Sequence, residues 1–167
     1  AGWWVSEKLD GVRASWDGKV LRFRSGRMLP APAWFLAVLP PVALDGELWL
    51  GRRRFDALSG LLRREDPEDP LWREVRYMLF DLPGAPGDFD TRLTHLRSLA
   101  DAAAAAWVQA VPQQRVADRA ALQRLLDEVL AGGGEGLMLH RADAPWQPGR
   151  SEALRKLTPW LDAEARV

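Results

Sequence analysis

Lys8 is the residue whose type and surroundings point most directly to chemistry. The chain holds 23 lysines and arginines together. Only three of them are lysines, namely Lys8, Lys19 and Lys156. An arginine can carry charge almost anywhere, but it does not lose its proton and attack, whereas a lysine amine can. A lysine in so arginine-rich a chain suggests that the amine itself is needed.

The residues that follow Lys8 suit a nucleophile beside a phosphate. Asp10 adds a carboxylate, Gly11 permits close backbone approach, and Arg13 offers a guanidinium fork that matches phosphate oxygens. The same stretch would also suit a surface strand with a solvated lysine and a turn at Asp10 and Gly11. Taken alone, it leaves both interpretations open.

Six segments in order resemble the covalent nucleotidyltransferases, the family of DNA ligases, RNA ligases and mRNA capping enzymes. The Lys-x-Asp-Gly-x-Arg pattern resembles the first signature of that family. The six segments are residues 8–13, 23–26, 44–48, 77–82, 135–139 and 154–157. The sequence of residues 6–13 and 159–165 is most similar to that of the minimal bacterial E-type, ATP-dependent DNA ligases. Six motifs in the family's order are far more specific than any one of them.

The resemblance implies that Lys8 attacks the α-phosphate of ATP and becomes adenylated. The attacking amine must be neutral, and nearby cations favour the loss of its proton. The candidate cations are Arg13, Arg24, Lys156 and a Mg²⁺ (or Mn²⁺) ion. The implied catalytic residues are Lys8, Asp10, Arg13 and Lys156. The implied nucleotide-binding residues are Glu7, Lys8, Arg13, Arg24, Glu47, Phe80, Met138 and Lys156.

Carboxylates and apolar side chains complete the implied site. Glu47 is expected at the ribose and, with Glu135, at the metal, because carboxylates accept from hydroxyls and bind Mg²⁺. Phe80 would stack on one face of adenine and Met138 would pack on the other. Periodicity alone also allows Phe80 and Met138 to be plain core, and the two glutamates to be solvated strand ends.

Arginine clusters are candidates for contact with nicked double-stranded DNA. Arg52, Arg53 and Arg54 form a dense basic run, which suits either a solvated surface or a clamp on the phosphate backbone. Arg24 joins them as a nucleic-acid candidate by resemblance. Lys19 is interpreted as a hairpin lysine, and His95 and His140 show no metal-like spacing or acidic partner pattern. Residues 132–134 are three glycines that lack the ending of a phosphate loop.

The composition fits one globular domain. The chain has 167 residues, of which 47% are hydrophobic and 28% charged, so it can bury a core and lacks the bias of disordered segments. No apolar run approaches the ~18 residues of a membrane span. The absence of cysteine excludes disulfides and thiolate chemistry, and the formal net charge of zero gives little general attraction for nucleic acid. We expect a monomer that does not enter membranes.

Local patterns predict a strand-rich order with inserted helices. The expected strands are residues 4–16, 42–50, 75–82, 136–140 and 153–157, with a hairpin turn at 17–18. The expected helices are residues 33–39, 55–64, 90–107 with an Asp90 cap, and 118–130 with an Asp118 cap. Because strands and helices do not alternate strictly, we predict an α+β fold. The resemblance specifies the nucleotidyltransferase (ATP-grasp-like) fold, with two antiparallel sheets and helices around a nucleotide pocket.

Two features depart from the family pattern. The last of the six segments, residues 154–157, resembles the start of the family's fifth motif. That motif normally reads Lys-x-Lys, and here Thr158 replaces its second lysine. We expect residues 1–158 to form the adenylation domain and residues 159–167, with a hinge-like 162–165, to lead toward an OB-fold domain that is absent from the chain. The alternatives are an RNA ligase, a capping-type enzyme, or a catalytically impaired module that binds nucleotide or nucleic acid.

The compartment and the biological role stay open at this point. The chain begins with Ala1-Gly2, which is consistent with removal of a preceding segment. The resemblance to bacterial E-type ligases suggests the periplasm, and the cytoplasm is the other possibility. A role in DNA repair by nick sealing follows from the resemblance alone.

Overall fold

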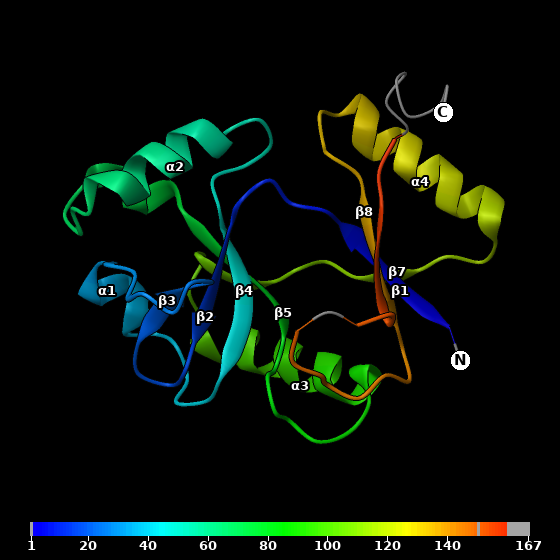
Figure 1. The fold of residues 1–167 in the computed structure, drawn as a ribbon, viewed down its shortest axis with the longest axis horizontal. Coiled ribbons are helices and arrows are strands. Elements are labelled where there is room, and N and C mark those ends of the chain that lie inside the picture. The colour runs from blue at the N-terminus through cyan, green and yellow to red at the C-terminus, as the bar shows by residue number, and fades with distance from the viewer. Residues whose placement is uncertain (1, 150, 160–167) are drawn as a thin grey trace.

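The fold consists of two β-sheets that lie side by side, with helices on their outer faces and between them (Figure 1). The computed structural model describes residues 2–149 and 151–159. The large sheet has the strand order β3-β2-β4-β5-β6, and the small sheet has the order β7-β1-β8-β9. The fold is therefore α+β, as predicted. In the described residues, no helix is long and apolar enough to cross a membrane.

The large sheet is built from the first two-thirds of the chain. Its strands are β2 (Val12–Trp16), β3 (Leu21–Phe23), β4 (Leu44–Trp49), β5 (Arg76–Asp81) and β6 (Val108–Ala110). The β2–β3 hairpin turns at Asp17 and Gly18, as predicted. Gly18 has a φ of 102°, and the Asp17 carboxylate accepts the backbone N–H groups of Lys19 and Val20. Most pairs are antiparallel, but β5 and β6 are parallel, which the prediction of antiparallel sheets missed.

Three helical segments pack against the large sheet and contribute buried residues to its core. They are α1 (Ala33–Leu36), α2 (Phe55–Arg64) and the 3-10 helix Pro70–Glu74. In α2 the buried residues are Leu58, Leu61 and Leu62, a spacing that places them on one helical face. The prediction for α2 was correct at both ends, whereas α1 is shorter than predicted and the 3-10 helix was not predicted.

The small sheet shares its apolar core with helix α4. Its strands are β1 (Trp3–Glu7), β7 (Gln114–Arg115), β8 (Leu137–Arg141) and β9 (Leu154–Leu157), and its helix is α4 (Arg119–Ala131). The buried cluster between them consists of Val5, Leu126, Val129 and Leu137. As predicted, the Asp118 side chain caps α4 by accepting the backbone N–H of Ala121.

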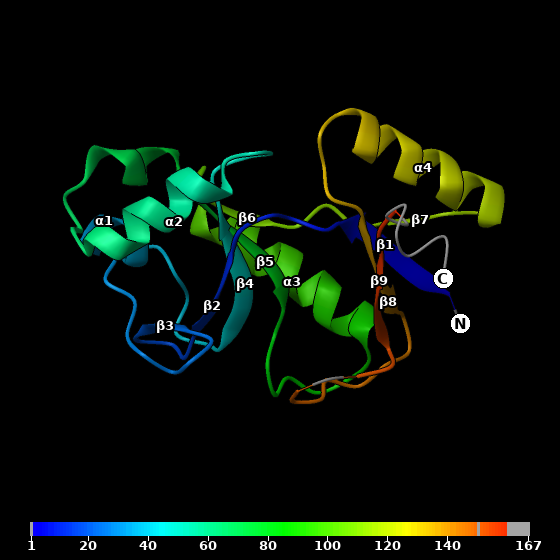
Figure 2. The same ribbon diagram turned by 45° about the horizontal axis from the view of Figure 1, so that its top comes forward.

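Helix α3 (Phe89–Ala103) lies below both sheets and reaches from one to the other (Figure 2). It packs on β5 and β6, and Trp4 of β1 donates its indole N–H to Asp90 at 2.6 Å. The predicted cap at Asp90 is wrong, because the helix begins at Phe89 and its N-cap is Asp88, two residues before Asp90. The side chain of Asp88 accepts the backbone N–H of Thr91 instead.

The predicted strand from residue 4 to residue 16 is two strands in two different sheets. β1 ends at Glu7 in the small sheet, and β2 begins at Val12 in the large sheet. The linking segment, residues 8–11, crosses from one to the other. A Cβ at Gly11 would overlap the carbonyl oxygen of Leu48, so glycine lets the chain pass tightly against β4. Alternation of apolar and polar residues reports the faces of strands but not the sheet to which each belongs.

Candidate active site

Lys8 stands at the point where the chain leaves the small sheet. Its backbone N–H donates to the carbonyl of Gly136 at 2.9 Å, which anchors the residue beside the start of β8. Its Nζ lies 2.8 Å from Oε1 of Glu135, and its side chain is 27% exposed. The predicted segments 8–13 and 135–139 therefore meet at this amine, which solvent and ligands can reach.

Glu47 is the residue of the large sheet that lies near Lys8. It lies on β4, opposite Arg13 of β2, and its Oε2 accepts the backbone N–H of Gly11 at 3.0 Å. Burial raises the pKa of the Glu47 carboxyl, and the nearby charges of Asp10 and Glu135 act in the same direction. The Gly11 hydrogen bond and the Lys8 charge only partly offset that effect. A carboxylate in this setting favours a cation beside it.

Asp10 is held by both of its carboxylate oxygens. Oδ1 accepts the indole N–H of Trp49 at 2.9 Å, and Oδ2 accepts the backbone N–H of Arg53 at 2.9 Å. Both donors come from the end of β4 or the loop after it. These contacts show how the segment 8–11 is fixed against the large sheet, and they leave the predicted catalytic role of Asp10 as a prediction.

Glu47 and Glu135 fit the predicted magnesium site only in part. Within residues 2–149 and 151–159, no three His, Cys, Asp or Glu side chains are arranged to hold a metal ion by themselves. Mg²⁺ is usually bound by one or two carboxylates together with substrate phosphates and waters. Two neighbouring glutamates near Lys8 are therefore compatible with a metal that arrives with the nucleotide.

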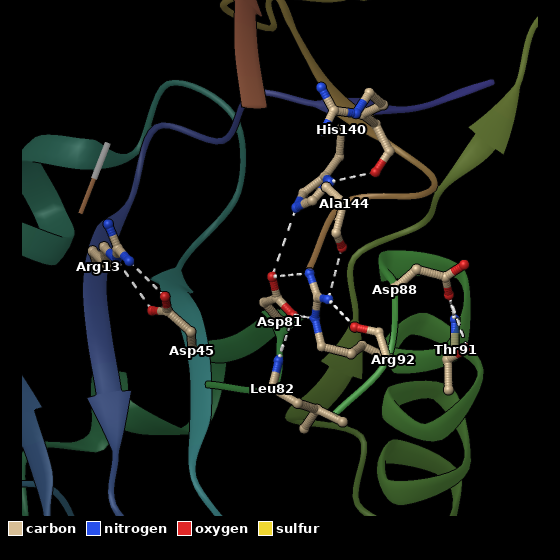
Figure 3. A network of polar contacts seen from close by, with 11 residues as sticks. Arg13, Asp45, Asp81, Leu82, Asp88, Thr91, Arg92, His140 and Ala144 are labelled. Atoms are coloured by element: carbon tan, nitrogen blue, oxygen red, sulfur yellow. Dashed lines mark hydrogen bonds and ion pairs between the residues drawn. The ribbon is translucent and has the colours of Figure 1, made fainter. Parts of the chain in front are cut away.

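Arg13 lies beside an aspartate, although the sequence suggested a fork for phosphate. Its Nε and Nη2 lie 3.1 and 2.5 Å from the two carboxylate oxygens of Asp45 (Figure 3). Burial raises the pKa of the Asp45 carboxyl despite the opposing effect of Arg13. The guanidinium also lies 5.6 Å from the centre of the Phe80 ring. Arg13 thus links the Lys8 segment to the aromatic side chain that was predicted to stack on adenine.

The predicted apolar contacts for adenine come from opposite sheets. Phe80 on β5 and Met138 on β8 are both only half-buried, so neither is plain core. Met138 is paired with Lys156 of β9, so these two side chains share one face of the small sheet. Arg155 is paired with Leu139 and lies over the Trp3 ring at 5.6 Å, on the other face. Lys156 and Arg155 therefore point to opposite faces, as alternation along the strand predicted for residues 153–157 requires.

The remaining predicted arginines have mixed surroundings. Arg24 is exposed in the turn after β3. Arg52 forms a two-point ion pair with Glu7, and Arg54 lies 2.8 Å from Glu74. Arg53 has no recorded ion pair within the described residues. Contact of these arginines with DNA therefore stays a prediction. Glu7, which was predicted to bind the nucleotide, pairs with Arg52.

Asp81, Arg92 and His140 form a polar network that sequence reasoning missed (Figure 3). Arg92 of α3 is 1% exposed and donates to both oxygens of Asp81 at 2.7 and 3.3 Å. It also donates to the carbonyl oxygens of Gly87 and Ala144. His140 Nε2 lies 3.6 Å from Asp81, so this histidine does have an acidic partner, contrary to the sequence interpretation. The network joins β5, α3 and β8.

Polar contacts in this network outweigh the effect of burial on the pKa of Asp81. Burial alone would raise the pKa of this carboxyl, but the contacts with His140 and Arg92 lower it below its usual value. A strand that ends in an aspartate was the only sequence signal here. The arginine that pairs with it lies eleven residues later on a helix, which no local pattern indicates.

Two surface hollows lie away from the Lys8 cluster. One of about 300 Å³ lies beside α3 and β6, and one of about 360 Å³ lies beside residues 141–153. Neither is lined by the predicted site residues. The candidate site is therefore defined by its converging charges and hydrogen bonds.

Comparison with known proteins agrees with this arrangement. No family model matches the chain. A curated DNA ligase from Haemophilus influenzae is 35% identical over 166 residues, which are 99% of this chain and 61% of that protein. A solved structure from a study of DNA binding by Lig E DNA ligases is 42% identical, has a TM-score of 0.88, and is matched over 95% of this chain and 62% of its own.

More distant structures share the fold alone. The Chlorella virus DNA ligase–adenylate is 17% identical with a TM-score of 0.80, over 94% of this chain and 61% of its own. The ATP-dependent DNA ligase of bacteriophage T7, solved with ATP, is 20% identical with a TM-score of 0.75, over 95% and 63%. The chain is thus similar to DNA ligases along nearly its whole length, and it shares its fold with solved DNA ligase structures.

Proposed function

We propose that this chain carries the ATP-dependent adenylation chemistry of a DNA ligase, with Lys8 as the nucleophile. The chain spans 61% of the Haemophilus relative and 62% of the Lig E structure, so the activity of a whole ligase goes beyond this comparison. The observation that supports the proposal is the convergence on Lys8. Its amine contacts Glu135 from the small sheet, and Glu47 approaches from the large sheet.

The first step forms a bond between Lys8 Nζ and the α-phosphorus of ATP while the bond to pyrophosphate breaks. The amine loses a proton, and pyrophosphate leaves. Little covalent help is needed in phosphoryl-type transfer beyond positioning and neutralisation of charge. Glu135 lies 2.8 Å from Nζ and holds the amine in place before the nucleotide binds. Lys156, on the face that carries Met138, is the cation we assign to the phosphates.

A magnesium ion bound with the nucleotide would neutralise phosphate charge, and Glu47 and Glu135 are the residues that would hold it. Phe80 and Met138 are half-buried residues on the two sheets. We assign them to the two faces of adenine, because both side chains present apolar surface to a ring.

The later steps concern nicked double-stranded DNA. AMP passes from Lys8 to the 5′-phosphate at the nick, and the 3′-hydroxyl then attacks that phosphate and releases AMP. We assign Arg24, Arg52, Arg53 and Arg54 to the phosphate backbone, since cationic side chains supply most of the affinity for DNA. The two ion pairs of Arg52 and Arg54 would compete with that contact.

Intact-mass spectrometry after incubation with ATP and Mg²⁺ tests the proposal. We expect one added AMP, mapped by peptide analysis to Lys8, and no adduct on Lys8→Arg. Incubation with GTP in place of ATP tests the alternative of a capping-type enzyme. An adduct on Lys156 or Lys19, labelling of Lys8→Arg, or a preference for GTP would each contradict the proposal.

A further inference from the structure

The three glycines at the end of α4 have a structural use that their sequence did not reveal. Gly132 offers its carbonyl oxygen to Nη1 of Arg52 at 3.2 Å. A Cβ at Gly132 would overlap that same nitrogen, and one at Gly133 would overlap the guanidinium of Arg53. A Cβ at Gly134 would lie 3.1 Å from Oε2 of Glu7 and would crowd α4. Glycine lets these side chains lie directly on the backbone.

Arg52 uses three of its nitrogens to join two parts of the chain. Nε and Nη2 lie 2.9 and 2.7 Å from the two carboxylate oxygens of Glu7, and Nη1 reaches Gly132. Such a two-point pair between a guanidinium and a carboxylate fixes direction as well as distance. Glu7 directly precedes Lys8, so Arg52 fixes the residue on one side of the nucleophile.

The next residue of the same loop fixes the other side. The backbone N–H of Arg53 donates to Oδ2 of Asp10 at 2.9 Å. Arg53 has a φ of 64°, a left-handed conformation that costs energy for a residue with a side chain. Such a strained conformation persists where surrounding contacts fix the backbone, and it is often found at functional sites. Here the conformation of Arg53 is fixed by its hydrogen bond to Asp10 and by the packing of its side chain on Gly133.

We infer that residues 51–54 and 132–134 form a clasp that positions Lys8 for attack, with Arg52 as a positioning residue. The inference rests on the proposed adenylation of Lys8. The loop after β4 holds Glu7, which directly precedes the nucleophile, and Asp10, which lies two residues after it. The same loop packs on the glycines that follow α4. Small displacements of a reacting group cost large factors in rate, so the clasp acts on the rate of attack and not on nucleotide affinity.

Two variants of the protein open the clasp by different routes. Arg52→Gln removes the guanidinium that pairs with Glu7. Gly132→Ala displaces that guanidinium, and Gly132 has a φ of −83°, which alanine adopts without strain. The control is Arg115→Gln. Arg115 Nη2 donates to both carboxylate oxygens of Asp90 in an exposed ion pair that joins β7 to α3 and does not involve the clasp.

Hydrogen exchange and single-turnover adenylation are then measured on each protein. We expect faster exchange of the amides of residues 7–11 in both clasp variants, with the control unchanged. The maximal adenylation rate should fall about ten- to a hundredfold, while the ATP concentration at half-saturation changes less than about twofold. Arg52→Lys should recover part of the rate, because an ammonium reaches one oxygen of Glu7 but cannot form the fork.

The outcomes separate the clasp from the proposed function. Unchanged exchange at residues 7–11 in Arg52→Gln overturns the clasp whatever the activity. A rate loss that lies entirely in ATP affinity, or one equalled by Arg115→Gln, also overturns it. If the wild-type protein forms no adduct on Lys8, the proposed function fails, and the exchange measurements still decide whether the clasp exists.

Discussion

The two sheets of this domain differ in how much core supports them. The large sheet packs on an extended cluster that includes the buried aromatic residues Phe35, Trp72 and Tyr77. The small sheet has four buried cluster residues, between β1, β8 and α4. Lys8 and Glu135 belong to the weakly supported half, and Glu47 belongs to the strongly supported half. Neither core alone therefore positions the candidate site.

Two sets of hydrogen bonds and ion pairs, called polar ties below, join the halves and position the site between them. At one place Arg92 joins Asp81 of the large sheet to the carbonyl of Ala144, which follows β8 (Figure 3). At the other, Arg52 joins the loop after β4 to Glu7 and Gly132. The first tie is buried and the second is partly exposed, so we expect the first to matter more for stability and the second more for rate.

Removal of the buried tie should have the largest effect on stability. Arg92→Met leaves the carboxylate of Asp81 buried without its main partner, which we expect to cost about 3–5 kcal/mol of unfolding free energy. Urea denaturation measures the loss. The control is Arg141→Met, which breaks an exposed pair with Asp143 and should cost less than about 1 kcal/mol. A similar loss in both variants would break the contrast between the ties.

The pH dependence provides a second measure of the same tie. The pKa of Asp81 is lowered in the folded protein, so its contribution to stability is present above its unfolded pKa of about 3.9. The contribution disappears as pH falls through the lower folded pKa. The stability difference between wild type and Arg92→Met should therefore shrink in acid. A difference that grows on acidification would contradict this account.

Truncation of one leucine in each core tests the difference between the two sheets directly. Leu58 of α2 is fully buried, and Leu126 of α4 is 5% exposed. We expect Leu58→Ala to cost about 3–5 kcal/mol, and Leu126→Ala about 2–3 kcal/mol because the smaller cluster can collapse around the space. Hydrogen exchange should show that Leu126→Ala loosens the small sheet while the large sheet keeps its protection. Equal losses spread over both sheets would show that the two halves unfold together.

Thr158 tests the two faces of the small sheet. Lys156 lies on the face with Met138, and Arg155 lies over Trp3 on the other face. If Thr158 continues the alternation, Thr158→Lys places a second cation near the phosphates and should speed Lys8 adenylation about tenfold. Arg155→Ala should change the rate little. Single-turnover assays at saturating ATP decide between them, and a severe loss in Arg155→Ala alone would reverse the assignment of faces.

The smallest expected effect is a gain in stability at the site itself. Burial raises the pKa of Glu47, so its contribution to stability is present below its unfolded pKa and is lost as pH rises through the folded pKa. Glu47→Gln avoids that loss and can still accept the N–H of Gly11. We expect about 0.5 kcal/mol of stabilisation at pH 7, with slower adenylation. Thermal unfolding between pH 4 and pH 8 should show the gain increasing with pH.

Local patterns predicted the elements well where one physical signal dominates. Helix α2 was placed correctly because its leucines repeat with helical spacing, and α4 because Asp118 stands at its start. The β2–β3 hairpin followed from Asp17 and Gly18. The predicted cap at Asp90 failed because Asp88, two residues earlier, is the same type of residue and caps the helix instead.

Short strands and distant partners could not be predicted in this way. β6 and β7 have three and two residues, too few to show alternation. Their strand structure depends on pairing with β5 and β1, which are distant in sequence. The pair of Arg92 with Asp81 likewise depends on how α3 packs, and so does the stacking of His140 on Phe89 at 3.7 Å.

The sequence by itself indicated the α+β class, the similarity to DNA ligases and the choice of candidate nucleophile. The type of a residue limits the reactions it can perform. The spacing in a motif such as Lys-x-Asp-Gly-x-Arg is local, so both are visible without the fold. Only the tertiary structure decided that Lys8 leaves one sheet and approaches Glu47 of the other, and that Arg13 pairs with Asp45. Such neighbours are set by the packing of two cores, and packing depends on contacts between residues that are far apart in the sequence.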